Sequence, residues 1–238
     1  MKKLFYISLI VTAVIFGFAS CATTQVSGKR KSPEYKTVLI DEKLDYLTTD
    51  IQYPSFDNYP DFSKIVKNTI VNNWESFKSY SKDEWNQMNA FNDRAFIPPF
   101  EYKVVTSVYS TNNYISVLIN TYIFSSGAHG NTSLISYNYN LNSGKYENLT
   151  TVTKLNLNQI SEICRNQLYE KLIAKNKNIT KPSDEVDMKE MINTGAFPQA
   201  GNFEIFTVGK KTATVYFEPY SVAPYSYGIQ TAEVKIAQ

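Results

Sequence analysis

The chain has 238 residues, of which 43% are hydrophobic, 14% aromatic and 19% charged, and its formal net charge is +2 at pH 7. This length and composition suffice for one domain with a substantial buried core. The near-neutral charge argues against a nucleic-acid-binding protein, which needs a concentrated basic surface to displace counterions. We therefore expect no nucleic-acid partner.

The first residues have the pattern of a secretory signal. Lys2 and Lys3 precede an apolar run at residues 4–18 that is shorter than a typical membrane span, and small residues follow it. Cys21 comes directly after Ala-Ser and resembles the acylated cysteine of a bacterial lipobox. We expect a signal peptide at residues 1–20 and a lipid anchor, palmitate included, on Cys21, which together place the protein outside the cytoplasmic membrane.

Residues 21–36 are polar and basic and show no hydrophobic periodicity, which predicts a flexible tether. The basic cluster at residues 29–31 is interpreted as part of this solvated tether, and contact with anionic lipid headgroups is the alternative. Removal of residues 1–20 leaves 22 basic and 22 acidic side chains. Cys164 would then be the single free cysteine, so no internal disulfide is expected.

The rest of the chain predicts one α+β domain at residues 37–238. Alternating apolar residues predict short strands, and steps of three and four predict a long helix from Pro60 to about Tyr80, a second at 157–174 and a short acidic one at 182–195. The expected strands are 37–40, 48–54, 100–109, 115–123, 135–141, 202–206, 212–217 and 232–236. We expect an antiparallel sheet with two or three helices packed on it.

One stretch, residues 113–149, contains the only histidine of the chain, His129. Gly127 and Gly130 flank it between two predicted strands and indicate a backbone bend that other residues resist. A structural loop, in which the imidazole binds neighbouring carbonyls, is one interpretation, and direct contact with a partner is the other. The following turn, Asn142–Gly144, places glycine where φ is expected to be positive.

A second candidate surface is the long loop at residues 218–228, which contains Pro219, Tyr220, Tyr225 and Tyr227. Tyrosines held by prolines offer stiff contact area with a polar tip, which suits a protein interface or stacking on sugar rings. Packing within the protein is the alternative for each of these tyrosines.

Catalytic and metal chemistry has weak support in the sequence. His129 could act as a base beside Ser125 or Ser126, but the nucleophile-elbow pattern is absent. One histidine and one cysteine in an apolar helix stripe are too few ligands for zinc, and Cys164 is interpreted as a core residue. Carboxylate pairs for glycoside hydrolysis stay possible, although the acids at 83–84 and 184–187 have helix-surface explanations. We expect no catalytic residues, no metal and no cofactor.

Two motifs carry a family resemblance: Ser126–Gly130, followed by Tyr137–Lys145 and Leu149, and then Phe217–Gly228. They resemble the extracytoplasmic domain at the C-terminal end of RsiV-type anti-sigma factors, which is also found beside the deacetylase domain of PdaC-type enzymes. The resemblance covers residues 37–237. The matching motif positions are Gly127, His129, Gly130, Gly144, Pro219, Tyr220 and Gly228.

The resemblance implies a binding role. In RsiV-type proteins this domain binds lysozyme, and in the PdaC type it accompanies an enzyme without supplying its metal-dependent chemistry. Nothing in the 238 residues resembles an anti-sigma segment or a histidine-rich deacetylase domain. We expect a non-catalytic, lipid-anchored recognition domain of a bacterial cell envelope, at the periplasm or cell surface, that binds a lysozyme-like protein as sensor or inhibitor. The predicted partner-binding residues are Gly127, His129, Gly130, Pro219, Tyr220, Tyr225 and Tyr227.

Two other functions stay open. The first is direct binding of peptidoglycan or another glycan through tyrosine stacking. The second is a cell-wall hydrolase whose acid pair the sequence does not reveal.

Overall fold

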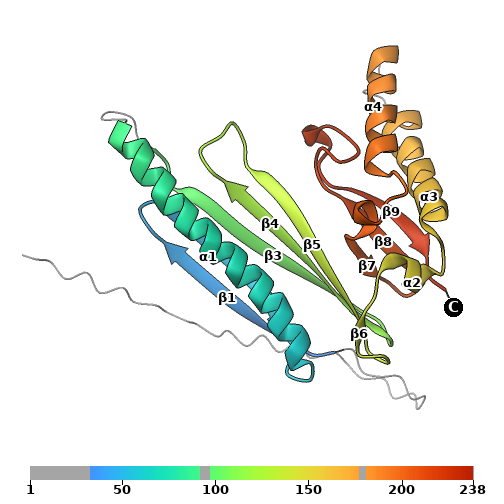
Figure 1. Cartoon of the computed structure of the whole chain (residues 1–238), viewed down its shortest axis with the longest axis horizontal. Coiled ribbons are helices and arrows are strands. Elements are labelled where there is room, and N and C mark those ends of the chain that lie inside the picture. Colours follow the sequence, from blue (N-terminus) through green and yellow to red (C-terminus); the bar gives the residue numbers. More distant parts are fainter. Residues whose placement is uncertain (1–32, 92–96, 177–180, 238) are drawn as a thin grey trace, which may run out of the picture.

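The computed structural model describes residues 33–91, 97–176 and 181–237 (Figure 1). The expected signal peptide, Cys21 and the tether up to residue 32 lie outside the described residues. The fold is α+β, as predicted, and its strands form two sheets where one was expected. The larger sheet has six strands in the order β1-β2-β3-β4-β5-β6, and the smaller has three in the order β7-β8-β9.

The elements follow the predicted order along the chain. The larger sheet contains β1 (Lys36–Lys43), β2 (Leu47–Ser55), β3 (Phe100–Ser110), β4 (Tyr114–Phe124), β5 (Asn131–Asn140) and β6 (Lys145–Tyr146). The smaller sheet contains β7 (Phe206–Val208), β8 (Thr212–Phe217) and β9 (Gln230–Lys235). The α-helices are α1 (Pro60–Phe91), α2 (Leu149–Thr153), α3 (Leu157–Tyr169) and α4 (Pro182–Gly195). A π-helix at Glu170–Ala174 extends α3, and 3₁₀ turns lie at Ala200–Phe203 and Tyr225–Tyr227.

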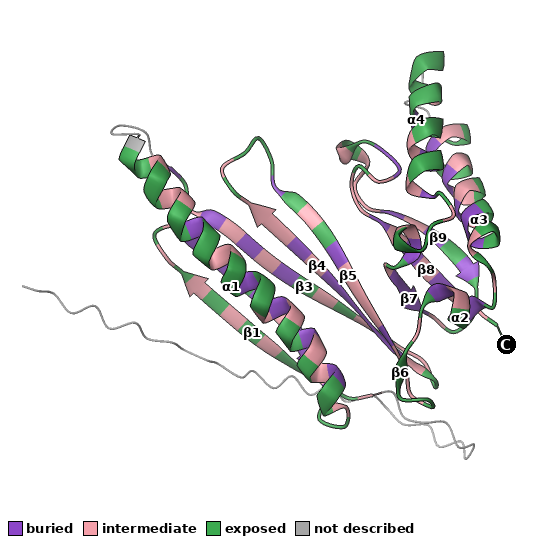
Figure 2. Ribbon diagram, viewed as in Figure 1, coloured by how far each residue is buried: buried purple, intermediate pink, exposed green. Residues whose placement is uncertain are grey.

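The first core lies between α1 and one face of the larger sheet. The buried side of α1 faces the strands and its other side is exposed (Figure 2). Alternate residues of β4 point into this core because successive side chains of a strand lie on opposite faces. Trp74 on α1 donates a hydrogen bond from Nε1 to Thr49 Oγ1 on β2, 3.0 Å away in the buried interior. Each large apolar side chain buried here contributes about 1.5–3 kcal/mol. The core-facing residues of α1 include Phe62, Val66 and Ile70, and those of β4 are Ile115, Val117 and Ile119.

One strand pair departs from the antiparallel prediction. β2 and β3 run parallel, with Leu47 opposite Phe100, and α1 is the connection between them. A helix that crosses a sheet returns the chain in its original direction, so the strands that it joins can pair in parallel. As a result, Ser55 and the start of α1 lie at one end of the sheet, and the β4–β5 loop lies at the other.

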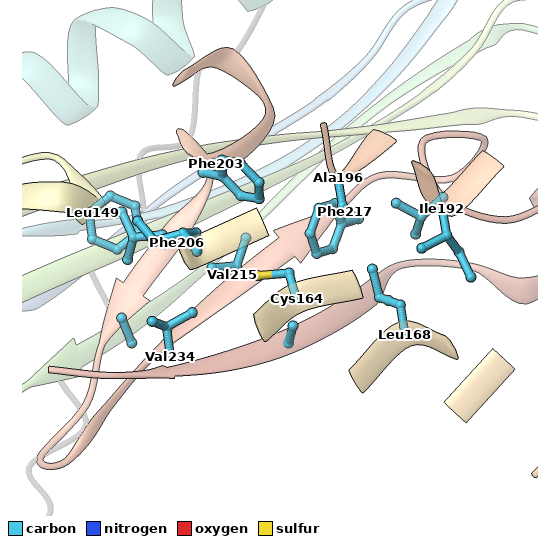
Figure 3. Packing of buried hydrophobic residues seen from close by; sticks show 14 of the residues in the cluster. Leu149, Cys164, Leu168, Ile192, Ala196, Phe203, Phe206, Val215, Phe217 and Val234 are labelled. Carbon is cyan, nitrogen blue, oxygen red and sulfur yellow. The ribbon is translucent and has the colours of Figure 1, made fainter. Parts of the chain in front are cut away.

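The second core lies between the smaller sheet and the helices α3 and α4 (Figure 3). Cys164 is fully buried in it, which confirms its interpretation as a core residue. Asn156 begins α3 with a capping box, in which its side chain and that of Gln159 each accept from the other residue's backbone N–H. The strand predicted at 202–206 is wrong for most of its length, since Ala200–Phe203 is a 3₁₀ turn and β7 begins at Phe206.

A buried polar network joins the two sheets. Ser116 of β4 donates to Asn138 Oδ1 of β5 at 2.6 Å and accepts from the Val208 N–H of β7 at 2.9 Å. Asn138 Nδ2 donates to the Phe206 carbonyl at 2.9 Å. Ser116 points away from the apolar face of β4, so β7 crosses the larger sheet on the face opposite α1. This crossing brings the predicted tyrosine loop close to β5.

Candidate functional site

The structure brings the histidine loop and the tyrosine loop together. His129 lies in the loop between β4 and β5, and its ring stacks on Tyr225 with ring centroids 4.1 Å apart and an interplanar angle of 23°. Tyr225 donates a hydrogen bond from its hydroxyl to the Gly130 carbonyl at 2.8 Å. His129 Nδ1 lies 2.9 Å from the same carbonyl. Both rings are therefore held against one backbone carbonyl.

Further contacts fix the tyrosine loop against the larger sheet. Glu218 follows β8 directly, and its carboxylate accepts a hydrogen bond from the Leu134 N–H of β5. Tyr220 has φ of 70°, a left-handed conformation that is uncommon for a residue with a side chain. Its N–H donates to the Ala223 carbonyl at 3.1 Å and closes a tight turn. The loop is thus held in one shape at the point where Tyr220 projects.

We call His129, Tyr220 and Tyr225 the aromatic shelf. Tyr220 is 57% exposed, and its ring centroid lies 5.5 Å from that of Tyr225. His129 is also exposed. Exposed aromatic side chains that are already ordered lose little conformational entropy on binding, which favours recognition of a partner.

The other predicted site residues lie in different surroundings. Tyr227 is partly buried against the second core, and its hydroxyl accepts from Asn176 Nδ2 at 2.9 Å, so this hydroxyl is already engaged within the protein. Pro219 precedes the left-handed Tyr220 and stiffens that turn. Gly144 and Gly228 have positive φ values of 68° and 64°. The turn glycine at 144 was predicted correctly.

A left-handed backbone conformation is not what requires the two glycines beside His129. Neither Gly127 nor Gly130 has positive φ, and the left-handed residue of this loop is Ser126, with φ of 60°. Gly130 is needed for space, because a Cβ atom there would lie 2.3 Å from the ring of Tyr122. Ser126 also buries its hydroxyl without a hydrogen-bond partner among the described residues.

The sequence patterns did not predict a groove that lies beside the aromatic shelf. It is a shallow cavity of about 370 Å³ between α4 and the tyrosine loop, and Tyr220 lines it together with Asp187 and Glu190. The acidic side chains of this helix were explained by the helix dipole alone. Asp187 and Glu190 are three residues apart and therefore neighbours on the helix surface, and this spacing could have indicated an acidic surface on α4 from the sequence.

The geometry gives little support to nucleophilic chemistry. Burial raises the pKa of Cys164 to about 12, so its thiol stays protonated at neutral pH. His129 Nδ1 contacts the Gly130 carbonyl, and the imidazole ring stacks on Tyr225. Within residues 33–91, 97–176 and 181–237, no group of three or more His, Cys, Asp or Glu side chains could hold a metal ion. The helices in these ranges do not combine the length and apolarity that a membrane span requires.

Two family models match adjacent parts of the chain. "Deacetylase PdaC" matches residues 40–132, and "Protein of unknown function (DUF3298)" matches residues 147–237. The first match covers most of the α1 side of the molecule, and the second covers the smaller sheet with its helices. His129 falls in the first region and Tyr225 in the second, so the aromatic shelf forms where the two regions meet.

Similar proteins agree with these matches. The chain is 23% identical over 185 residues to the peptidoglycan-N-acetylmuramic acid deacetylase PdaC of Bacillus subtilis, which covers 78% of this chain and 36% of that protein. The chain thus spans about a third of that relative's length.

Two crystal structures share the fold. A DUF3298 family member from Bacteroides fragilis superposes with a TM-score of 0.59 at 16% identity, over 87% of this chain and 94% of that one. A DUF3298 protein from Pseudomonas aeruginosa superposes with a TM-score of 0.57 at 14% identity, over 87% and 92%. Together, the two family matches support a PdaC-like/DUF3298 domain in this chain, and the two crystal structures show its fold.

Proposed function

We propose that this protein is a non-catalytic recognition domain of the bacterial cell envelope that binds a lysozyme-like protein through the aromatic shelf, as a sensor or an inhibitor. The relative named as a peptidoglycan deacetylase supports a setting at the cell wall. The resemblance to the RsiV-type domain supports a lysozyme-like partner. The observation that carries the proposal is the stacking of His129 on Tyr225 beside the exposed Tyr220.

The shelf has the features of a protein-binding surface. The residues that contribute most of the binding energy of a protein interface are commonly aromatic, lie at its centre and are surrounded by a polar rim. The rim here is acidic, because Asp187 and Glu190 are exposed beside Tyr220 and form no ion pairs within the described part of the chain. Such a rim suits a partner that presents lysine or arginine side chains near its contact surface.

Direct binding of a cell-wall glycan is the second candidate. Tyr220 is 57% exposed beside a groove that contains carboxylates, and sugar rings can stack on aromatic side chains while carboxylates accept bonds from their hydroxyls. Under this alternative Tyr220 would bind the apolar face of a sugar ring.

Calorimetric titration of the purified protein with lysozyme, and separately with soluble peptidoglycan fragments, tests both candidates. We expect lysozyme binding that Tyr220→Ala weakens at least about tenfold, because central aromatic contacts contribute about 2 kcal/mol or more. His129→Ala and Glu190→Gln should weaken it less. Tyr80→Ala is the matched control, since Tyr80 is 49% exposed on α1, away from the shelf.

The outcomes separate the two candidates. Binding of lysozyme that only the shelf variants weaken supports the proposal. Binding of peptidoglycan fragments alone, lost in Tyr220→Ala, replaces it with the glycan function. Absence of binding to either probe overturns both.

A further inference from the structure

A second groove lies far from the aromatic shelf, between the first turns of α1 and the edge strand β1. Its volume is about 710 Å³, within the range of pockets that hold small molecules. Strands β1 and β2 form its floor, with Val38 opposite Tyr53. Lys64, Lys67 and Asn68 of α1 line its side. The parallel pairing of β2 with β3 places this groove at the end of the larger sheet opposite the β4–β5 loop.

Tyr53 is the distinctive residue of this groove. Its side chain is only 5% exposed, yet its hydroxyl forms no hydrogen bond with any described residue. Burial alone raises its pKa. Buried hydroxyls nearly always have a partner, because an unsatisfied one costs about 1–3 kcal/mol. The Tyr53 hydroxyl is not fully enclosed, and the groove that Tyr53 lines is where water or a ligand can supply its partner.

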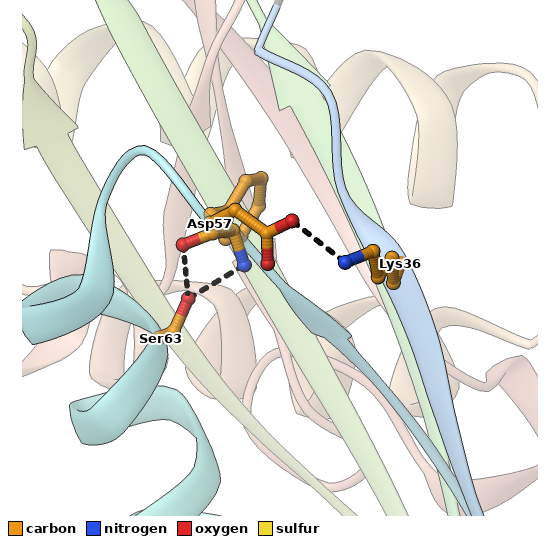
Figure 4. Close-up of polar contacts among 4 residues, drawn as sticks. Lys36, Asp57 and Ser63 are labelled. Carbon is orange, nitrogen blue, oxygen red and sulfur yellow. Dashed lines mark hydrogen bonds and ion pairs between the residues drawn. The ribbon is translucent and has the colours of Figure 1, made fainter. Parts of the chain in front are cut away.

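The groove also carries unbalanced positive charge. Lys64 and Lys67 are exposed on the same face of α1, three residues apart, and neither forms an ion pair within the described ranges. Asp57 is the one carboxylate in the lining, and Lys36 neutralises it at 2.7 Å (Figure 4). Two ammonium groups therefore stay available to a ligand.

The wall of the groove is held in place by hydrogen bonds. The Phe56 N–H donates to Ser63 Oγ at 2.6 Å, and Ser63 donates back to the Phe56 carbonyl at 3.1 Å (Figure 4). These two bonds fix the turn between β2 and α1, on which Asp57 and Pro60 lie. The groove therefore keeps its shape without a ligand, which lowers the entropic cost of binding.

We infer that this groove binds a saccharide carrying a carboxylate. Lys64 and Lys67 would pair with the carboxylate, since charge-assisted hydrogen bonds are the strongest available to such a group. The Tyr53 hydroxyl and the Asn68 amide would bond to ring hydroxyls or acetamido groups, and Val38 and Pro60 provide apolar contact for a ring face. A neutral saccharide would leave both ammonium groups unpaired and bind more weakly.

The inference goes beyond the proposed function and rests on it only for the cell-envelope setting that suggests the probe. That probe is the disaccharide N-acetylglucosaminyl-N-acetylmuramic acid, and its neutral counterpart is N,N′-diacetylchitobiose, which lacks the lactyl carboxylate. Both are titrated calorimetrically into the purified protein at low and high salt. We expect the acidic disaccharide to bind at least about tenfold more tightly than N,N′-diacetylchitobiose and to lose affinity at high salt.

Two variants locate the site. Lys64→Gln combined with Lys67→Gln should weaken binding about tenfold or more, since each exposed side chain can change without disturbing the core. Tyr53→Phe removes only a hydroxyl without a protein partner and should weaken binding about threefold while leaving the fold intact. Lys82→Gln and Tyr80→Phe, on the exposed side of α1 away from the groove, are matched controls that should bind normally.

The aromatic shelf provides an independent control. Tyr220→Ala should leave binding of the acidic disaccharide unchanged, so failure of the shelf proposal and failure of this one can be told apart. Equal affinity for N,N′-diacetylchitobiose, binding unchanged in the lysine and Tyr53 variants, or no binding of the acidic disaccharide would each overturn the inference. An acidic tripeptide of the same charge that binds more tightly than the disaccharide would also overturn it.

Discussion

The ring of His129 stacks on the ring of Tyr225, 4.1 Å between centroids, although the two residues extend from different sheets. His129 follows β4 of the larger sheet, and Tyr225 follows β8 of the smaller one. The contact adds an aromatic clamp to the polar network of Ser116 and Asn138, which joins the sheets elsewhere.

His129 and Tyr225 should be energetically coupled. We expect His129→Ala and Tyr225→Ala to show a coupling free energy of about 0.5–1.5 kcal/mol in a double-mutant cycle, because stacked rings interact beyond their buried area. The measurement is urea unfolding of the four proteins. Tyr225→Phe, which keeps the ring and loses only the bond to the Gly130 carbonyl, should retain most of the coupling. Effects that add within about 0.3 kcal/mol would contradict a coupled pair.

Gly195 should be intolerant of any side chain. A Cβ atom there would lie 2.0 Å from the carbonyl oxygen of Ser221, so Gly195→Ala must displace the backbone of the tyrosine loop. We expect a loss of about 1–3 kcal/mol in the free energy of unfolding and a changed near-ultraviolet circular dichroism signal from the tyrosines. Gly201→Ala, where a Cβ atom meets nothing within 4 Å, is the control and should be close to neutral.

Replacement of Ser126 by glycine should stabilise the protein. Ser126 has φ of 60° and a buried hydroxyl without a hydrogen-bond partner within the described chain, and both features are unfavourable. We expect Ser126→Gly to raise the free energy of unfolding by about 1 kcal/mol after the entropy cost of glycine, and the melting temperature by about 2–4 °C. Ser126→Ala removes the hydroxyl but keeps the strained backbone and should gain less. A melting temperature lowered by Ser126→Gly would refute this explanation of the loop.

Stability should fall at alkaline pH. Burial is the main cause that raises the pKa of four tyrosine hydroxyls from 10.0 to about 12, at Tyr102, Tyr114, Tyr146 and Tyr216. The unfolded chain ionises these groups near pH 10 and the folded chain does not, so unfolding releases protons above that pH. Their contribution is complete below pH 10 and is lost as the pH rises through about 12.

Tyrosinate absorbance and circular dichroism, followed together from pH 9 to pH 12.5, provide the measurement. We expect part of the tyrosinate signal to appear only with loss of structure. Tyr102→Phe should make the free energy of unfolding depend less on pH above 10, because phenylalanine has no hydroxyl that ionises when this deeply buried position unfolds. Complete ionisation of all tyrosines near pH 10 in the folded protein would contradict the burial argument.

Local patterns predicted most elements correctly because they record which face of an element is buried. The alternation at 115–123 and the helical spacing that begins at Pro60 are such patterns, and β4 and α1 confirm them. The 3₁₀ turn at Ala200–Phe203 was missed, since apolar residues in a short segment do not distinguish a strand from a tight turn. The loop motif likewise gives no sign that Tyr227 packs partly against the second core while Tyr220 stays exposed.

The sequence by itself determined the α+β class, the order of the elements and the two loops that meet at the shelf, because these follow from periodicity and turn residues within short segments. Only the tertiary structure decided the parallel pairing of β2 with β3, the division into two sheets and the contact of His129 with Tyr225. The same holds for the groove in which Tyr53 lies with Lys64 and Lys67. An apolar face indicates that a segment packs against something, but long-range packing decides its partner and therefore which side chains meet.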